Sequence, residues 1–288
     1  MSQSKQALRT RIRSVNSTKK ITKAMEMIAN AKLFRQRSRM EANREYAQRL
    51  QDTVDEIVMK NPGVDCSYLK PKSSEAKATV IFCSDLGLCG GYNQNVLKLA
   101  KAELRLEDPV ILIGTSLYRQ MREAGFNLLN KEPISSDHIH FLELKEKVEE
   151  AIYLYDRDEV GTVQLLYTEF VNTMTFRARF DQLLPCLLDE AAIREETESH
   201  DRMNVETMFD PDPETILNEL IPMMLYDVAY ADWMESTTAE QGSRRMAMKT
   251  ASDNADELSE ELKLEYNKAR QASITQEITE IVGGSNAV

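Results

Sequence analysis

The sequence predicts a mixed fold class, in which long α-helices at the two ends of the chain enclose an α/β domain. The first observation behind this prediction is that residues 2–61 contain no glycine and no proline, and that residues 214–282 contain one of each, Pro222 and Gly242. At 1.5 Å per residue, helices of those lengths extend roughly 85 to 100 Å. No helix that long buries its apolar stripe in one compact core, so we expect the two to pair as an antiparallel coiled coil.

The first helix is expected from about Ser4 to Lys60. Apolar residues recur along it at spacings of three and four, beginning with Leu8, Ile12 and Val15, and they form the stripe of an amphipathic helix. The helix ends at Asn-Pro-Gly, residues 61–63, because proline and glycine are the strongest helix breakers. A linker is expected to follow, up to residue 77.

The second observation is a change of pattern between residues 78 and 210. Short apolar runs bounded by turn residues alternate there with amphipathic stretches. This alternation predicts right-handed βαβ units, and hence a mainly parallel, Rossmann-like sheet with helices on both faces. The expected strands are 79–84, 109–114, 162–168 and 173–180, and the expected helices are 93–107, one that ends near 124, and 142–155.

The last helix is predicted to begin after Asp212, which is placed to cap it, with Pro213 in its first turn. Pro222 is expected to kink this helix or to interrupt it briefly. Its end is expected at Val282, before two glycines. The predicted division of the chain is 1–61 for an N-terminal shaft helix, 78–210 for the inserted α/β domain and 211–288 for a C-terminal shaft helix.

Charge is distributed unevenly along the chain. The formal charge is −11, yet residues 1–45 carry twelve Lys or Arg against three acidic residues, a local charge of +9 that leaves −20 for the remainder. Such polarity indicates an N-terminal surface that meets an acidic partner. The longest aliphatic run, Val110–Ile113, is far shorter than the ~20 residues that cross a bilayer. We therefore expect a soluble protein that can sit on a membrane-bound partner.

Two features could suggest chemistry, and neither predicts it strongly. The four cysteines lack any paired spacing, and with three scattered histidines they form no recognisable zinc set, so we expect reduced thiols and no metal or cofactor. Residues 87–93, Gly-Leu-Cys-Gly-Gly-Tyr-Asn, stand between a strand and a helix but lack the lysine and hydroxyl of a P-loop. A tight turn is the favoured interpretation. Cys89 as a nucleophile and Asp85 as a catalytic acid stay open as lesser alternatives.

The basic N-terminal helix has two interpretations. It could bind nucleic acid through phosphates, as part of a coiled-coil adaptor, or it could meet a protein surface rich in Asp and Glu. Aromatic residues are nearly absent among the first 46 residues, with only Phe34 and Tyr46, and no leucine heptad follows the basic stretch. These observations favour a protein partner. A nucleotide-binding α/β enzyme that uses the turn at 87–91 is the other alternative.

Three motifs spread over the full length resemble the gamma subunit of F-type ATP synthases. Residues 21–28, Ile-Thr-Lys-Ala-Met-Glu-Met-Ile, resemble the family's N-terminal signature. Residues 84–93, Ser-Asp-Leu-Gly-Leu-Cys-Gly-Gly-Tyr-Asn, resemble a turn of its central domain, and residues 266–283 resemble the bacterial C-terminus. The chain departs from the family pattern at Leu86, Gly242 and Arg245, where the family has a polar or charged residue, alanine and methionine.

The resemblance implies a rotor shaft without catalytic chemistry of its own. In the family, the terminal helices form a coiled coil inside a hexamer of alternating alpha and beta subunits. The inserted domain and the lower shaft form a foot on the membrane c-ring, together with the epsilon subunit. The resemblance thus implies one copy per complex, no nucleic acid, and a peripheral place on the cytoplasmic face of the bacterial inner membrane, where ion flow is coupled to ATP synthesis or hydrolysis.

The resemblance also implies site residues. By motif match, Met25 faces the beta subunit, with Lys23 and Glu26 near it. Phe209 and Asp210, just before Pro211, are the expected contacts of the foot with the c-ring and epsilon, from position more than from residue identity. Positions implicated in the family in contacts with beta and in coupling are matched by Arg244, Gln271, Thr275 and Glu277.

Overall fold

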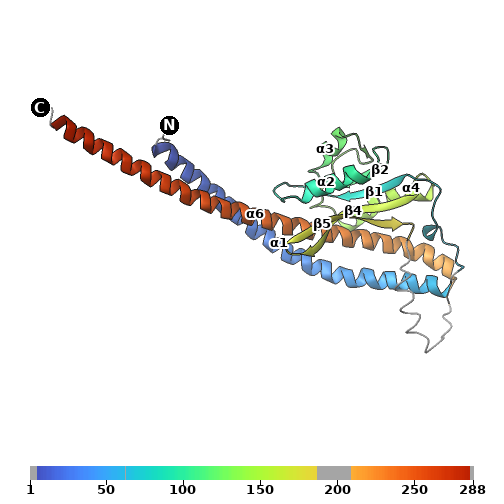
Figure 1. The fold of residues 1–288 in the computed structure, drawn as a ribbon. Helices are drawn as coiled ribbons and strands as arrows, with labels where there is room; N and C mark the ends of the chain where they lie inside the picture. Colours follow the sequence, from blue (N-terminus) through green and yellow to red (C-terminus); the bar gives the residue numbers. More distant parts are fainter. Residues whose placement is uncertain (1–4, 62, 187–208, 286–288) are drawn as a thin grey trace. The chain divides into compact units, whose positions relative to one another are not determined.

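The computed structural model describes residues 5–61, 63–186 and 209–285 (Figure 1). Two long helices and a five-stranded sheet with shorter helices make up this part of the chain. In chain order the elements are α1 (Lys5–Lys60), a 3-10 turn (Ser67–Leu69), β1 (Lys77–Phe82), α2 (Tyr92–Glu103), β2 (Pro109–Ile113), α3 (Tyr118–Glu123), β3 (Asn127–Leu128), α4 (Phe141–Asp156), β4 (Thr162–Asn172), β5 (Thr175–Leu184) and α6 (Pro213–Ser285).

Both predicted long helices are present. Helix α1 ends at Lys60 as expected, and α6 begins at Pro213 with Asp212 as its cap, since an Asp212 carboxylate oxygen accepts a bond from the Thr215 N–H at 2.9 Å. The expected interruption at Pro222 is wrong, because α6 continues through it. The expected end at Val282 is also wrong, since the helix continues to Ser285 and accommodates two glycines, each of which weakens a helix by only about 1 kcal/mol.

The sheet has the strand order β3-β2-β1-β4-β5. Its first four strands are parallel, and β5 pairs with β4 in the antiparallel sense, which confirms the prediction of a mainly parallel sheet. At its centre, Val80 of β1 is opposite Ile111 of β2 on one side and Leu165 of β4 on the other. The two-residue β3 was not predicted. β1 also begins and ends two residues earlier than expected.

Helices cover both faces of the sheet, as predicted. On one face, α2 and α3 pack over residues such as Ile81 and Leu112. On the other face, α4 packs together with the end of α1 and the beginning of α6, burying Phe82, Tyr155 and Leu225. Burial of these side chains supplies most of the stabilisation of this part of the fold.

The chain divides into two compact units. The sheet unit comprises residues 32–243, and the helix-pair unit comprises residues 1–31 and 244–288. Both long helices contribute to both units. No helix among the described residues combines the length and apolarity that a membrane span requires.

The helix-pair unit contains the first part of α1 and the last part of α6. Ser259 donates a hydrogen bond to Asn16 at 3.1 Å, and Lys19 forms an ion pair with Asp256. The residue numbers of both pairs add to 275, which is the mark of two helices running in opposite directions. The predicted antiparallel pairing is therefore confirmed in this unit (Figure 1).

Small and polar residues dominate the buried side of this pair. On α1, Thr22 and Ala29 are buried seven residues apart, a coiled-coil spacing. The buried residues of α6 follow at spacings of three and four: Arg244, Met248, Ser252, Ala255, Ser259 and Leu262. Small side chains at such positions let two backbones approach closely. Every described side chain of α6 after Leu262 is exposed or half-buried.

Candidate functional site

The carboxyl edge of the sheet is where α/β folds bind their ligands, in the crevice where the strand order reverses. Here the reversal lies between β1 and β4, and helix α6 fills it. Beyond its last pairing with β1, strand β4 donates the Thr168 N–H to the Ser236 hydroxyl at 3.1 Å and the Phe170 N–H to the Glu235 carboxylate at 2.9 Å. The position that a nucleotide would take in such a fold is therefore occupied by the chain itself.

The glycine-rich turn forms the other wall of this crevice. Gly90 takes a positive φ of 60°, which confirms the interpretation as a tight turn, and Leu88 takes the same region with a φ of 61°. Ser243 of α6 donates a hydrogen bond to the Cys89 carbonyl at 2.6 Å, and the hydroxyls of Tyr92 and Ser236 lie 2.8 Å apart. Cys89 is only 2% exposed, so its thiol is not presented to a substrate.

Asp85 is held by four hydrogen bonds at the same edge. Its carboxylate accepts from the Thr115 N–H at 3.1 Å, the Ser135 hydroxyl at 2.7 Å, the Ser136 N–H at 3.0 Å and the Asp137 N–H at 2.8 Å. Partial burial disfavours the charge, but these donors outweigh it, and the pKa of Asp85 lies below its ordinary value. An ionised carboxylate whose acceptor sites are filled this way is an anchor, and it is unsuited to proton transfer.

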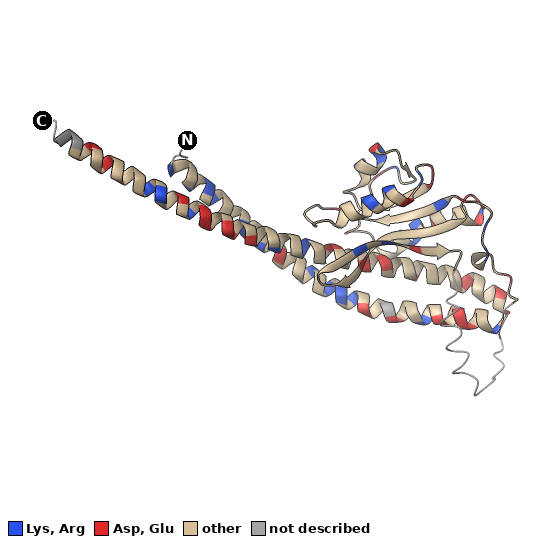
Figure 2. Ribbon diagram, viewed as in Figure 1, with Lys and Arg blue, Asp and Glu red and all other residues tan. Residues whose placement is uncertain are grey.

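A basic groove lies on α1 in the helix-pair unit. Figure 2 shows Lys and Arg in blue along α1. The groove encloses about 580 Å³. Lys23 bonds to Glu26 at 2.9 Å, and this hydrogen bond and the charge of Glu26, with a smaller effect from Asp253, raise the pKa of Lys23. The lining residues are Asn16, Lys19, Lys20, Lys23, Ala24 and Met27. The sequence showed the lysines, and the structure shows that they share one surface.

The predicted contact residues of the helix-pair unit fall into two groups. Met25 is half-buried, between exposed Lys23 and half-buried Glu26. Arg244 is buried, at 7% exposure. With paired residue numbers adding to 275, Arg244 lies opposite residue 31, within two helical turns of Met25. These four residues form the lower group.

Gln271, Thr275 and Glu277 form the tip group. All three are exposed, and Thr275 donates a hydrogen bond to the Gln271 carbonyl one turn earlier at 3.0 Å. Gln271 lies about 30 Å along α6 from the level of Met25, because Met25 faces residue 250. The structure therefore does not bring the two groups together. Ile274 and Ile278 are exposed on the same stretch.

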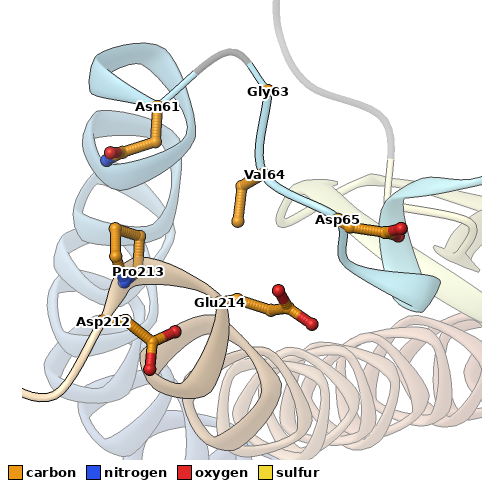
Figure 3. A pocket seen from close by; sticks show the side chains of 7 residues that line it. All are labelled: Asn61, Gly63, Val64, Asp65, Asp212, Pro213 and Glu214. Carbon is orange, nitrogen blue, oxygen red and sulfur yellow. The ribbon is translucent and has the colours of Figure 1, made fainter.

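The predicted foot residues lie at the start of α6 in the sheet unit. Phe209 is half-buried against the core, and Asp210 is exposed. Beside them is a pocket of about 420 Å³ (Figure 3). Its lining residues are Asn61, Gly63, Val64, Asp65, Asp212, Pro213 and Glu214. Three carboxylates give the pocket an acidic lining, which sequence reasoning did not anticipate because Asp65 is distant in sequence from the other two. Among the described residues, no group of acidic, His and Cys side chains is arranged to hold a metal ion.

Comparison of the sequence with known proteins gives full-length matches. The family model described as ATP synthase matches residues 4–288. The ATP synthase gamma chain of Alkaliphilus metalliredigens is 37% identical over 285 residues, covering 98% of each chain. The sodium ion specific ATP synthase gamma chain of Acetobacterium woodii is 33% identical over 301 residues, covering all of both chains.

Solved structures show the same fold. A rotor chain of the Euglena gracilis mitochondrial ATP synthase superposes with a TM-score of 0.66 at 16% identity, covering 94% of this chain and 98% of that one. A central-stalk chain of the Tetrahymena thermophila mitochondrial ATP synthase gives 0.57 at 23% identity, covering 81% and 99%. At these low sequence identities, the comparison with solved structures shows a shared fold and nothing more.

Proposed function

The chain belongs to the ATP synthase gamma-chain family, and from this premise we propose that it is the central rotor shaft of a bacterial F-type ATP synthase. In this role it transmits rotation of a membrane c-ring to a catalytic hexamer of alpha and beta subunits. Its partners are the hexamer, the epsilon subunit and the c-ring, with one copy per complex. The observation that carries the proposal is the antiparallel helix pair within a chain that matches the family from end to end.

The helix pair is suited to transmitting torque. Two helices packed side by side resist bending and twisting better than one, and small buried residues such as Ala29 and Ala255 bring their backbones close. By the same register, Lys5 faces residue 270, so the remainder of α6 extends past the described part of α1. The exposed tip group is therefore free to contact a surrounding ring of other subunits.

The basic groove supports contact with the beta subunits. Exposed lysines attract an acidic loop without interlocking with it, so contacts can break and form again at each step of rotation. We propose that Met25, Lys23, Glu26 and Arg244 make these contacts at the lower level, and that Gln271, Thr275 and Glu277 make them at the tip. A shaft drives its partner by binding one conformation better than another, so these differential contacts are the means of coupling.

The acidic pocket supports a foot at the other end of the described chain. Its carboxylates are Glu214, Asp65, which pairs with Lys70 at 2.7 Å, and Asp212, which caps α6. Together they give the region near Phe209 and Asp210 a negative charge that attracts basic side chains of a partner. We assign contact with the c-ring and epsilon to this region. The functional division that follows is 1–61 and 211–288 for the shaft and 78–210 for the inserted domain.

From the same premises we infer that the chain is a non-catalytic subunit that is peripheral to a membrane. The crevice used for ligands by related architectures is filled by α6, and Cys89 and Asp85 are engaged within the fold. We propose that the chain does no chemistry and needs no cofactor. It is placed on the cytoplasmic face of the bacterial inner membrane through the complex that it joins.

The test is co-expression with alpha and beta subunits from the same organism. Purification is expected to yield a complex with one copy of this chain per three alpha–beta pairs, and sustained ATP hydrolysis is expected to require it. A chain that stays alone, or that binds nucleotide or nucleic acid by itself, would overturn the proposal.

Coupling is then tested at the tip group. Gln271→Ala is expected to lower hydrolysis in the complex, whereas Gln276→Ala, the same change at an exposed residue bonded to Glu280, serves as the control. Equal effects of the two variants would remove Gln271 from the contact surface.

A further inference from the structure

Both long helices contact one short loop of the sheet unit, residues 135–137. From α1, the Lys32 ammonium forms an ion pair with the Asp137 carboxylate at 3.2 Å. From α6, the Trp233 indole N–H donates to the Ser136 hydroxyl at 3.2 Å. The loop thus bridges Lys32 and Trp233, which are 201 residues apart in sequence.

Asp85 fixes this loop to the sheet. Three of its four hydrogen bonds come from the loop itself, from the Ser135 hydroxyl and the N–H groups of Ser136 and Asp137, and the fourth comes from Thr115 after β2. Hydrogen bonds to an ionised acceptor are about twice as strong as neutral ones. One carboxylate therefore holds the segment that both helices contact.

Next to this loop, α6 has a second set of attachments. Glu235 and Ser236 accept bonds from the end of β4 beyond its pairing with β1, and Ser243 bonds to the glycine-rich turn. The sheet unit ends at Lys32 on α1 and at Ser243 on α6, the same residues that make these contacts. Polar attachments therefore lie near the point where each helix leaves the sheet unit. The apolar core holds α1 at Val54 and α6 from Leu217 to Ala229.

We propose that the carboxyl edge of the sheet is a collar that fixes α1 and α6 where they leave the sheet unit, and that Asp85 is the positioning residue that stiffens it. The inference rests on the proposed rotor function, because only a torque-carrying chain needs such a collar. A rod fixed only at its base bends and twists over its whole free length, and a second support near the exit shortens that length. The crevice that serves ligands in other α/β folds serves here to hold a helix.

The first test replaces Asp85 by Asn, which keeps the shape but turns an amide N–H₂ toward groups that are themselves donors. In the purified full-length chain, hydrogen exchange at the amides of Thr115, Ser136 and Asp137 is expected to accelerate on the order of tenfold. The matched control is Asp158→Asn, which removes an exposed carboxylate held by one ion pair to Lys72. Exchange at the loop is expected to be unchanged in that variant.

The second measurement uses the assembled complex, fixed through its hexamer and without ATP. A particle attached through Arg119→Cys, on the surface helix α3, reports angular fluctuations of the sheet unit. The variance of the angle is expected to rise about twofold in Asp85→Asn and to stay at the wild-type value in Asp158→Asn. Unequal loss of stability does not imitate this result, because the fluctuation is measured only in complexes that have assembled.

Each outcome supports or overturns the proposed role of Asp85. Faster exchange with an unchanged angular variance would show that the loop softens but does not support the helices, and unchanged exchange would show that Asp85 does not fix the loop. If Asp85→Asn fails to assemble, the same variance is measured in Trp233→Phe, which loses the bond to Ser136 and keeps an aromatic ring beside Tyr230. Failure of the wild-type chain to join the hexamer would instead overturn the proposed function.

Discussion

At the residue scale, Gly242 lies against an aromatic ring, and this contact decides the effect of replacing it. A Cβ at this position would be 2.7 Å from two ring atoms of Phe176 and 3.5 Å from Phe170. Alanine is favoured over glycine inside a helix by about 1 kcal/mol, whereas overfilling a packed site costs about 1–3 kcal/mol. We expect Gly242→Ala to lower the free energy of unfolding by about 1 kcal/mol, measured by chemical denaturation.

Replacing Phe176 is expected to reverse the sign of the effect of Gly242→Ala on the free energy of unfolding. In a Phe176→Ala background the ring is gone, so Gly242→Ala is expected to stabilise by about 1 kcal/mol, its helix-propensity value. Stabilisation by alanine in both backgrounds would show that the ring moves aside without cost. The sequence shows Gly242 only as a departure from the family pattern, because Phe176 is 66 residues away in the chain and their contact cannot be seen there.

Asp232 is a buried carboxyl on α6 that faces other acids. Burial, followed by the charges of Asp181 and Glu235, raises its pKa well above the ordinary value, and Arg179 offsets this only in part. Asp181, which shares a hydrogen bond with Asp232, also has a raised pKa, first because of burial. Tyr167 completes the surroundings, and its pKa is raised by burial and then by Asp232.

This arrangement predicts a dependence of stability on pH. Between the ordinary pKa of Asp232 and its raised folded value, the folded state binds more protons than the unfolded state, so the free energy of unfolding falls as pH rises. Asp232→Asn cannot ionise. We expect its melting temperature to rise relative to wild type as pH rises above about 4, the ordinary pKa of an Asp carboxyl, by a few degrees for each ~1 kcal/mol relieved. A difference that stays constant with pH would contradict this explanation.

At the scale of elements, the helix pair depends on small residues. Ala255 is buried in the pair, and leucine has nearly the same helix propensity as alanine. Ala255→Leu is therefore expected to destabilise by about 1–3 kcal/mol through overpacking alone. Ala272→Leu, at an exposed position of the same helix, is the control and is expected to leave thermal unfolding unchanged. Equal melting of the two variants would show that the helices can separate at Ala255 without cost.

The elements differ in how far the sequence predicts them. The long helices were predicted to within a few residues because glycine and proline are absent from residues 2–61 and occur only once each in residues 214–282. β3 has only two residues, too few for a periodic pattern. The position of β1 between β2 and β4 follows from contacts across the sheet, as does the filling of the crevice by Ser236, which lies 68 residues beyond Thr168. Local patterns cannot contain such pairings.

The candidate site shows the same limit. The motifs gave the residues that we propose for the contact surfaces, and the register of the helix pair separates them into a lower group and a tip group. The role of Asp85 could not be predicted, because its partners lie 30 to 52 residues away and three of its four donors are backbone N–H groups. The acidic pocket was missed for a similar reason, since Asp65 and Glu214 approach only in the folded chain.

At the scale of the whole molecule, stability and function are predicted to separate along α6. The described residues after Arg270 are exposed or half-buried and face no described residue of α1 in the register of the pair. A chain that ends at Arg270 is expected to melt within about 2 °C of the full chain, since surface changes usually alter stability by less than ~0.5 kcal/mol. In complex with alpha and beta subunits, it is expected to hydrolyse ATP more slowly. A large loss of stability would place part of the core in the tip.

The exposed isoleucines at the tip have a consequence for the cell that makes this chain. Ile274, Ile278 and Ile281 are 44%, 55% and 72% exposed, a stripe of apolar surface that water disfavours until another protein covers it. Copies synthesised in excess of their partners would present this stripe to one another and to proteases. The cell is therefore expected to balance translation of the subunits or to degrade unpartnered copies promptly, because the last turns of this helix are apolar.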